Sequence, residues 1–210
     1  MNVTEIKAVI FDCDGVMFDT AEANRMYYNI ILDQFNKPVL TDDQFVKVHM
    51  FTVAEAIAFL FPEMDTLAPV YRFMKTVGYD RFTKYMTMAP GLKQLLNKLH
   101  ESGYKRGVAT NRTNTMASVL TANRLEHCFE IVVTAADVDH PKPEPDQLLK
   151  ILDVFSFYPG EMVFIGDSFY DARAAEKAHV PFIAYNNESL DADCHVNSMA
   201  ELHQVLELDK

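Results

Sequence analysis

The chain has 210 residues, 49% hydrophobic and 23% charged, a composition typical of soluble globular proteins that excludes disordered, collagen-like and coiled-coil classes. Its net charge is −11 without a run of Lys or Arg, so we expect no nucleic acid as a partner, because an acidic surface repels a polyanion. No segment approaches about 18 consecutive apolar residues, and MNVTEIK lacks a signal-peptide pattern. We therefore expect a cytoplasmic protein that does not bind membranes.

Three cysteines are spread widely along the chain: Cys13, Cys128 and Cys194. They form no CxxC pair and their number is odd, which argues against a disulfide framework and against a zinc site. We expect reduced thiols that are mostly buried, because free cysteine behaves as a small hydrophobic residue.

Short apolar runs rich in β-branched and aromatic residues recur along the chain, with helix-like segments between the later ones. Little polar alternation within the runs favours strands of a parallel sheet covered on both faces. The sequence thus predicts an α/β fold, a Rossmann-like doubly wound parallel sheet. The expected strands are Lys7–Phe11, Lys105–Ala109, Phe129–Val133, Met162–Ile165 and Pro181–Tyr185, and the expected helices are Leu92–Leu99, Asn114–Leu125 and Pro145–Leu152.

The region from Ala21 to Met88 interrupts this alternation, because it reads as helical throughout and contains no expected strand. Pro90–Gly91 is a strong turn signal at its end. We predict a core domain of residues 1–16 and 89–210 and an inserted all-helical cap domain of residues 17–88. The expected cap helices are Glu22–Phe35, Asp42–Val48, Val53–Phe61 and Ala68–Tyr85.

Acidic side chains follow two of the expected strands. Asp12 and Asp14 come directly after the first, and Asp167 and Asp171 follow the fourth. Parallel strands bring their carboxyl ends to one edge, where two carboxylates about 4 Å apart repel by roughly 4 kcal/mol. Such a cluster requires a cation or raised pKa values, and an all-oxygen site suits Mg²⁺. The alternative for the second pair is that Asp167 or Ser168 simply caps the following helix.

Two further signals would serve a phosphoryl group. Thr110 and Asn111 end the second strand with a hydroxyl and an amide. Lys142 stands in the segment His140–Pro145, where prolines at alternate positions deny helix to the residues between them. We therefore expect Lys142 to be a fixed cation rather than a solvated surface lysine.

The motifs FDCDG, ATN, PKPEP and GDSFYD occur in an order that resembles the phosphatase branch of the haloacid dehalogenase-like superfamily. The chain is similar there to phosphoglycolate phosphatases and β-phosphoglucomutase-like proteins, from Lys7 to about Tyr185. The resemblance implies that Asp12 attacks phosphorus and forms an aspartyl-phosphate. It implies that Asp14 protonates the leaving alcohol and later deprotonates water. It also implies Mg²⁺ held by the Asp12 carboxylate, the Asp14 backbone carbonyl and Asp167.

The same resemblance implies residues for the phosphoryl group. Thr110 and Lys142 would bind its oxygens, assisted by the backbone N–H of Asn111. Asp171 would steady Lys142 or the waters on the metal. The expected reaction is Mg²⁺-dependent hydrolysis of a small phosphorylated metabolite, such as phosphoglycolate, a sugar phosphate or a nucleotide.

A helical insert in this branch closes over the active site and selects the substrate, as the cap is expected to do here. The candidates for cap residues that face the substrate are Arg25, Tyr28, His49 and Arg72, although each is also explained by packing or solvation.

Asn24 stands where β-phosphoglucomutases carry an acid/base histidine, and an amide cannot transfer a proton near neutral pH. Two alternatives stay open beside the phosphatase: a phosphometabolite- or partner-binding protein with little turnover, and a sugar phosphomutase. We expect a monomer or a homodimer.

Overall fold

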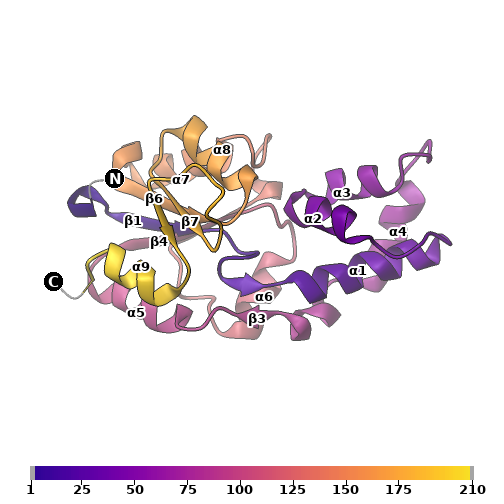
Figure 1. Cartoon of the computed structure of the whole chain (residues 1–210), viewed down its shortest axis with the longest axis horizontal. Coiled ribbons are helices and arrows are strands. Elements are labelled where there is room, and N and C mark those ends of the chain that lie inside the picture. The colour runs from indigo at the N-terminus through magenta and orange to yellow at the C-terminus, as the bar shows by residue number, and fades with distance from the viewer. Residues whose placement is uncertain (1–2, 209–210) are drawn as a thin grey trace.

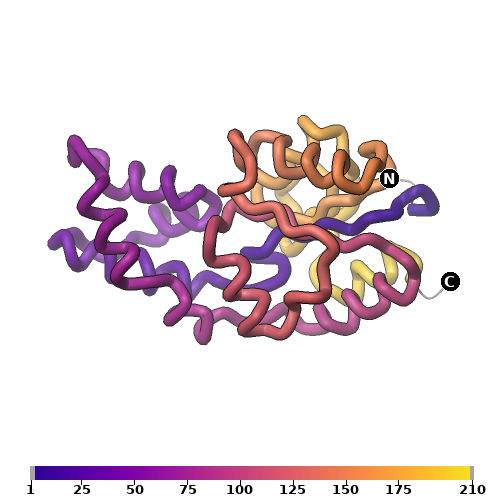
Figure 2. Tube along the Cα trace, turned by 180° about the vertical axis from the view of Figure 1, so that it is seen from behind, coloured from indigo at the N-terminus to yellow at the C-terminus, as the bar shows by residue number. Residues whose placement is uncertain are grey.

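The structure is a computed structural model that describes residues 3–208. Its two parts lie end to end, a sheet covered by helices and a group of packed helices (Figure 1). The chain enters the helical part after its first long strand and later returns to the sheet, as the reverse view in Figure 2 shows. Within residues 3–208, no helix combines the length and the apolar character needed to cross a membrane.

Within the described residues, six parallel strands form the main sheet in the order β5-β4-β1-β6-β7-β8. The central strand β1 pairs with β4 on one side and β6 on the other, and its residues are fully buried because helices cover both faces. The strands are β1 (Ala8–Phe11), β4 (Lys105–Thr110), β5 (Ile131–Thr134), β6 (Met162–Gly166), β7 (Phe182–Tyr185) and β8 (Cys194–Val196).

Helices pack on both faces of this sheet, each through an apolar stripe. The helix α5 (Leu92–Glu101) buries Leu92, Leu95, Leu96 and Leu99, which share one helical face. It covers one face together with α6 (Met116–Asn123) and α9 (Met199–Val205), while α7 (Asp146–Phe155) and α8 (Phe169–Ala178) cover the other. The predicted doubly wound α/β fold is confirmed.

Some predicted element boundaries were wrong. The strand β8 was not predicted, because three residues of mixed polarity carry too little pattern. The strand β5 begins at Ile131 rather than Phe129, and α7 continues to Phe155. The helix predicted over Ala68–Tyr85 is interrupted at Gly78, whose φ of 65° lies in the left-handed region that ends helices.

The helical part has its own hydrophobic cluster, which includes Ile31, Ile57 and Val70. Two of its helices begin with reciprocal side-chain caps, from Thr41 and Thr52, that satisfy their first backbone N–H groups. Its helices are α1 (Ala21–Gln34), α2 (Asp42–Met50), α3 (Val53–Leu60) and α4 (Ala68–Val77), followed by the 3₁₀ segment η2 (Asp80–Tyr85).

A short antiparallel ribbon joins the two parts. The strand β2 (Phe18–Asp19) pairs with β3 (Thr87–Met88), so the outgoing and returning chains run side by side. No strand was predicted at β3, because two residues show no periodicity. Phe18 packs with the core under the sheet, whereas the separate cluster begins with α1. We propose that residues 17–88 form a cap domain, hinged at this ribbon.

If the cap is a separate cooperative unit, damage to its core will stay local. Ile57→Ala removes fully buried methyl groups and should lower the stability of residues 21–77 by about 2–5 kcal/mol. Amide hydrogen exchange should then accelerate in α1–α4 while β1 and β4 keep their protection. Leu96→Ala, a matched change under the sheet, serves as the reverse control. Equal loss of protection in both parts after Ile57→Ala would show a single cooperative unit.

Candidate active site

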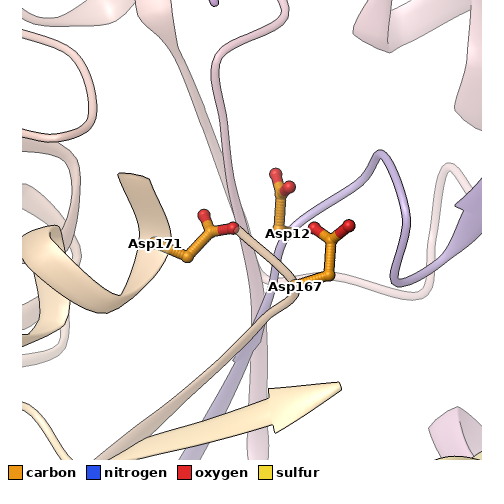
Figure 3. A group of neighbouring side chains, drawn as sticks. All are labelled: Asp12, Asp167 and Asp171. Carbon is orange, nitrogen blue, oxygen red and sulfur yellow. The ribbon is translucent and has the colours of Figure 1, made fainter. Parts of the chain in front are cut away.

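Three carboxylates meet at the carboxyl edge of the sheet. Asp12 follows β1, Asp167 follows β6, and Asp171 lies one turn into α8 (Figure 3). One oxygen from each lies within 4.8 Å of the others. The arrangement follows from the pairing of β1 with β6, which brings the ends of both strands together.

Two glycines make room for these carboxylates. Gly15 has a φ of 79°, and a Cβ there would lie only 2.0 Å from Asp167 Oδ2. At Gly166 a Cβ would lie 2.3 Å from the Cβ of Asp171. A larger residue at either position would displace a carboxylate, so these glycines belong to the construction of the site.

The ammonium of Lys142 lies among the carboxylates. It is 2.8 Å from Asp12 Oδ1 and 2.6 Å from Asp171 Oδ1, and it donates to the Ala109 carbonyl at 3.0 Å. Burial lowers the pKa of Lys142, but the two carboxylates outweigh it and raise the pKa overall. The lysine therefore stays charged and offsets part of the negative charge.

Two side chains hold the Lys142 loop against the end of β4. The amide of Asn111 donates to the Lys142 carbonyl at 2.9 Å. Gln147, which is fully buried, accepts from the Lys142 N–H at 3.2 Å and donates to the Thr110 carbonyl at 2.7 Å. The sequence analysis missed Gln147; a glutamine on the buried side of α7 was the signal that could have found it.

Burial and mutual repulsion set the protonation of the carboxylates. Burial is the main cause that raises the pKa of Asp12 to about 7, opposed by Lys142 and assisted by the charges of Asp171 and Asp14. Burial also raises the pKa of Asp167 well above its usual range, and Asp171 and Asp12 add to this. Such raised values indicate a cluster that stabilises an added cation.

The oxygens of this cluster fit a hard divalent cation. Asp12 Oδ1 is buried and, within the described residues, accepts no well-directed hydrogen bond, although the Lys142 ammonium is close enough for an ion pair. Asp171 is already committed, because Lys142 and Ser168 occupy its oxygens. Asp12 and Asp167 are therefore the carboxylates that remain for a metal such as Mg²⁺.

The helix-capping alternative at this motif is partly correct. Ser168 caps α8, with its hydroxyl accepting from the Asp171 N–H at 3.2 Å and Asp171 accepting from the Ser168 N–H at 3.0 Å. Asp171 thus has two roles, since its other oxygen holds Lys142. Asp167 caps no helix, and the amide of Asn187 supports its backbone carbonyl at 2.8 Å.

Asp14 lies apart from the other three carboxylates. Its two oxygens accept from Nε and an NH2 group of Arg112, both at 2.7 Å, and Oδ1 also accepts from the Thr20 hydroxyl at 2.5 Å. Burial alone would raise the pKa of Asp14, but Arg112 outweighs it and lowers the value to about 2. The sequence analysis missed Arg112, which directly follows the ATN motif.

Cap residues complete the surroundings of Asp14. The Tyr79 hydroxyl accepts from Arg112 at 3.1 Å and donates to Asn24, whose amide lies 3.1 Å from His49 Nδ1. Burial lowers the pKa of His49, assisted by Arg112 and opposed by the charges of Asp14 and Asp19. Of the other cap candidates, Tyr28 lines the same cleft, Arg25 pairs with Asp42 at 2.9 Å, and Arg72 is exposed.

A cleft of about 660 Å³ separates the cap from this edge of the sheet. Asp12, Thr110 and Lys142 line its core side, and cap residues such as His49 and Tyr79 line the other. The cleft is large enough for a small phosphorylated molecule with its phosphoryl group at Asp12.

Comparisons with known proteins decide the family. The family model of haloacid dehalogenase-like hydrolases matches residues 9–185. The chain belongs to this family. The predicted resemblance is confirmed, as is the predicted enzyme class, a phosphatase of this family.

Individual relatives agree with this assignment. A phosphoglycolate phosphatase of Nitrosospira multiformis is 30% identical over 96% of both chains, and the pyrophosphatase PpaX of Bacillus pumilus is 26% identical over 85% of this chain and 82% of its own. A crystal structure of a subfamily IA hydrolase of the same superfamily, from Geobacter sulfurreducens, shares 37% identity and superposes with a TM-score of 0.78, covering 96% of this chain and 97% of its own.

Removal of the buried lysine should destabilise the protein strongly. Lys142→Met leaves Asp12 and Asp171 without their cation in a buried place, so the free energy of unfolding should fall by about 3–5 kcal/mol. Urea denaturation measures this loss. Lys177→Met breaks the exposed pair with Glu144 and should cost less than about 1 kcal/mol. Similar losses in the two variants would contradict the role given to Lys142.

Proposed function

We propose that the protein is a Mg²⁺-dependent phosphatase that hydrolyses a small phosphorylated metabolite through an aspartyl-phosphate on Asp12. The observation that carries this proposal is the buried Asp12 carboxylate, which lines the cleft next to Lys142 and Asp167. A nucleophile, a fixed cation and a second carboxylate at one sheet edge are the groups that phosphoryl transfer to a carboxylate requires.

The phosphoryl group would bind through core residues. The Lys142 ammonium lines the cleft and offers its positive charge to phosphoryl oxygens. The Thr110 hydroxyl accepts from the Arg112 N–H at 3.2 Å, which leaves its own O–H free to donate to a phosphoryl oxygen. The backbone N–H of Asn111 is a further donor, while its side chain is occupied by the Lys142 carbonyl.

The reaction would proceed in two steps, transfer of the phosphoryl group to Asp12 and its hydrolysis. An oxygen of the Asp12 carboxylate forms a bond to phosphorus, the ester P–O bond breaks, and the leaving oxygen takes a proton from Asp14. Asp14 is ionised beside Arg112 in the free protein, so it takes up this proton from solvent when substrate binds. Water then attacks phosphorus and gives its proton to the Asp14 carboxylate, while the bond between phosphorus and Asp12 breaks. Inorganic phosphate and the alcohol leave, Asp14 releases its proton to solvent as it pairs with Arg112 again, and both aspartates return to their starting states.

Asp12, the backbone carbonyl of Asp14 and Asp167 would hold the Mg²⁺ ion. When bound, the ion supplies positive charge that offsets the phosphoryl oxygens and the clustered carboxylates. Asp171 acts on the reaction through Lys142, which it holds at 2.6 Å beside Asp12.

Loss of the nucleophile should abolish turnover. Asp12→Asn keeps the size of the side chain but removes the attacking oxygen, so phosphate release should fall on the order of 10⁴-fold or more. The wild type, quenched in acid during turnover, should show the mass of one added phosphoryl group on the peptide that contains Asp12. Asp153→Asn, an exposed change on α7, is the matched control. Near-normal turnover by Asp12→Asn would exclude the mechanism.

Mg²⁺ should stabilise the folded protein through Asp167. At about 100 times its dissociation constant, Mg²⁺ should raise the Tm by about 5–10 °C, and EDTA should reverse the shift. Asp167→Asn should lose most of this shift, while Asp153→Asn keeps it. Equal shifts in the two variants would show that the ion binds elsewhere.

Product analysis separates the other candidate functions. Release of inorganic phosphate from a member of a panel of phosphorylated metabolites would support the phosphatase. A rearranged sugar phosphate as the product would instead indicate a mutase. Asn24 argues against the mutase, since its amide carries no titratable proton and contacts Asp14 and His49. Binding without phosphate release would indicate a binding protein. The monomeric or dimeric state stays a prediction.

A further inference from the structure

The guanidinium of Arg112 holds Asp14 in a bidentate ion pair. Nε donates to one carboxylate oxygen and an NH2 group to the other, both at 2.7 Å. The Arg112 side chain is only 7% exposed and that of Asp14 18%. Bidentate pairs of this kind are among the strongest hydrogen-bonded contacts in proteins.

The cap keeps this guanidinium in place. Its central carbon Cζ lies over the ring of Tyr79, 4.8 Å from the centroid, and an NH2 group donates to the Tyr79 hydroxyl at 3.1 Å. The other NH group donates to Thr115 at 3.3 Å. Because Arg112 is fixed from both sides, Asp14 rather than Arg112 must move if the pair separates.

Separation has an electrostatic requirement. If Asp14 turned toward a leaving group bound beside Asp12, a buried guanidinium would lose its partner, and an unpaired buried charge is strongly unfavourable. Another anion must therefore replace the carboxylate on Arg112. Arg112 lines the same cleft as Asp12 and Lys142, so an anionic group of the substrate can reach it there.

We propose that Arg112 selects phosphate esters whose leaving group carries a second negative charge, and that this charge replaces Asp14 on Arg112 and frees Asp14 to act on the leaving oxygen. Arg112 is thus both a specificity-determining residue and a positioning residue for Asp14. The inference rests on the proposed phosphatase function, and it adds a substrate class and a coupling between recognition and the acid. A carboxylate or a second phosphoryl group would supply the charge.

Three esters of equal chain length test the proposal: 2-hydroxyethyl phosphate, 2-phosphoglycolate and the bisphosphate of ethylene glycol. They differ in whether the far end is neutral, a carboxylate or a phosphoryl group. The wild type should show kcat/KM for one or both charged esters about 10- to 100-fold above that for the neutral ester. The preferred charged ester identifies which source supplies the charge.

Arg112→Gln should remove this preference selectively. Its kcat/KM for the charged esters should fall about 10- to 100-fold because their second charge loses its partner. The value for 2-hydroxyethyl phosphate should not fall, because Asp14 is no longer held by Arg112. Arg112→Lys keeps the charge without the planar fork and should retain part of the preference. Lys75→Gln removes another cation from the lining of the cleft and should leave the preference in place.

A binding measurement separates failure of this inference from failure of the phosphatase function. Calorimetric titration of Asp12→Asn and of Asp12→Asn with Arg112→Gln should show the same selective loss of affinity for the charged esters. Equal losses for charged and neutral esters, or a preference that depends on Lys75 instead, would overturn the inference while hydrolysis stands. If the wild type hydrolyses no ester, the phosphatase proposal fails. If Asp12→Asn also binds charged and neutral esters equally, the inference about Arg112 is overturned as well.

Discussion

The ammonium of Lys142 lies 2.8 Å from Asp12 and 2.6 Å from Asp171, in a place from which water is almost excluded. Without a cation there, the ionised carboxylates, each with one oxygen within 4.8 Å of the others, would repel by roughly 4 kcal/mol per pair at an effective dielectric near 20. The surrounding structure holds the ammonium and the carboxylates in these positions. Gln147 and Asn111 fix the lysine loop to the end of β4, and the buried strands fix the carboxylates relative to it.

The residues proposed to bind the phosphoryl group and to recognise the rest of the substrate, Thr110 and Arg112, lie on one short stretch of chain at this edge of the sheet. Thr110 ends β4 on the core side of the cleft, and Arg112, two residues later, contacts Tyr79 of the cap. In the proposed reaction, a substrate that spans this distance would contact both ends of this segment, so its orientation would be set by residues that the sheet holds directly. On the cap side, the Tyr79 hydroxyl joins Arg112 to Asn24 by hydrogen bonds.

The main sheet and the residues at its strand ends could be predicted because burial on both faces leaves a strong apolar pattern, as in β1 and β6. Asp12, Thr110 and Asp167 could be placed at one edge for the same reason. Lys142 could be predicted as a fixed cation because prolines at alternate positions restrict its loop. The pairing of Asp14 with Arg112 could not be predicted, since 98 positions separate the two residues and they follow different strands, β1 and β4. The ribbon of β2 with β3 is too short to show any periodicity.

Two aspartates only two positions apart are held in opposite electrostatic settings. Asp12 shares one ammonium with Asp171, and burial raises its pKa to about 7, whereas Asp14 has a guanidinium to itself and its pKa is about 2. Exposure to solvent does not explain this difference, because both side chains are mostly covered. The charges around each acid explain it. Asp12 shares one ammonium with Asp171 and is repelled by the charges of Asp171 and Asp14, whereas the planar guanidinium donates to both oxygens of Asp14. A DxD motif therefore gives the position of two acids, while the partner of each acid determines its charge.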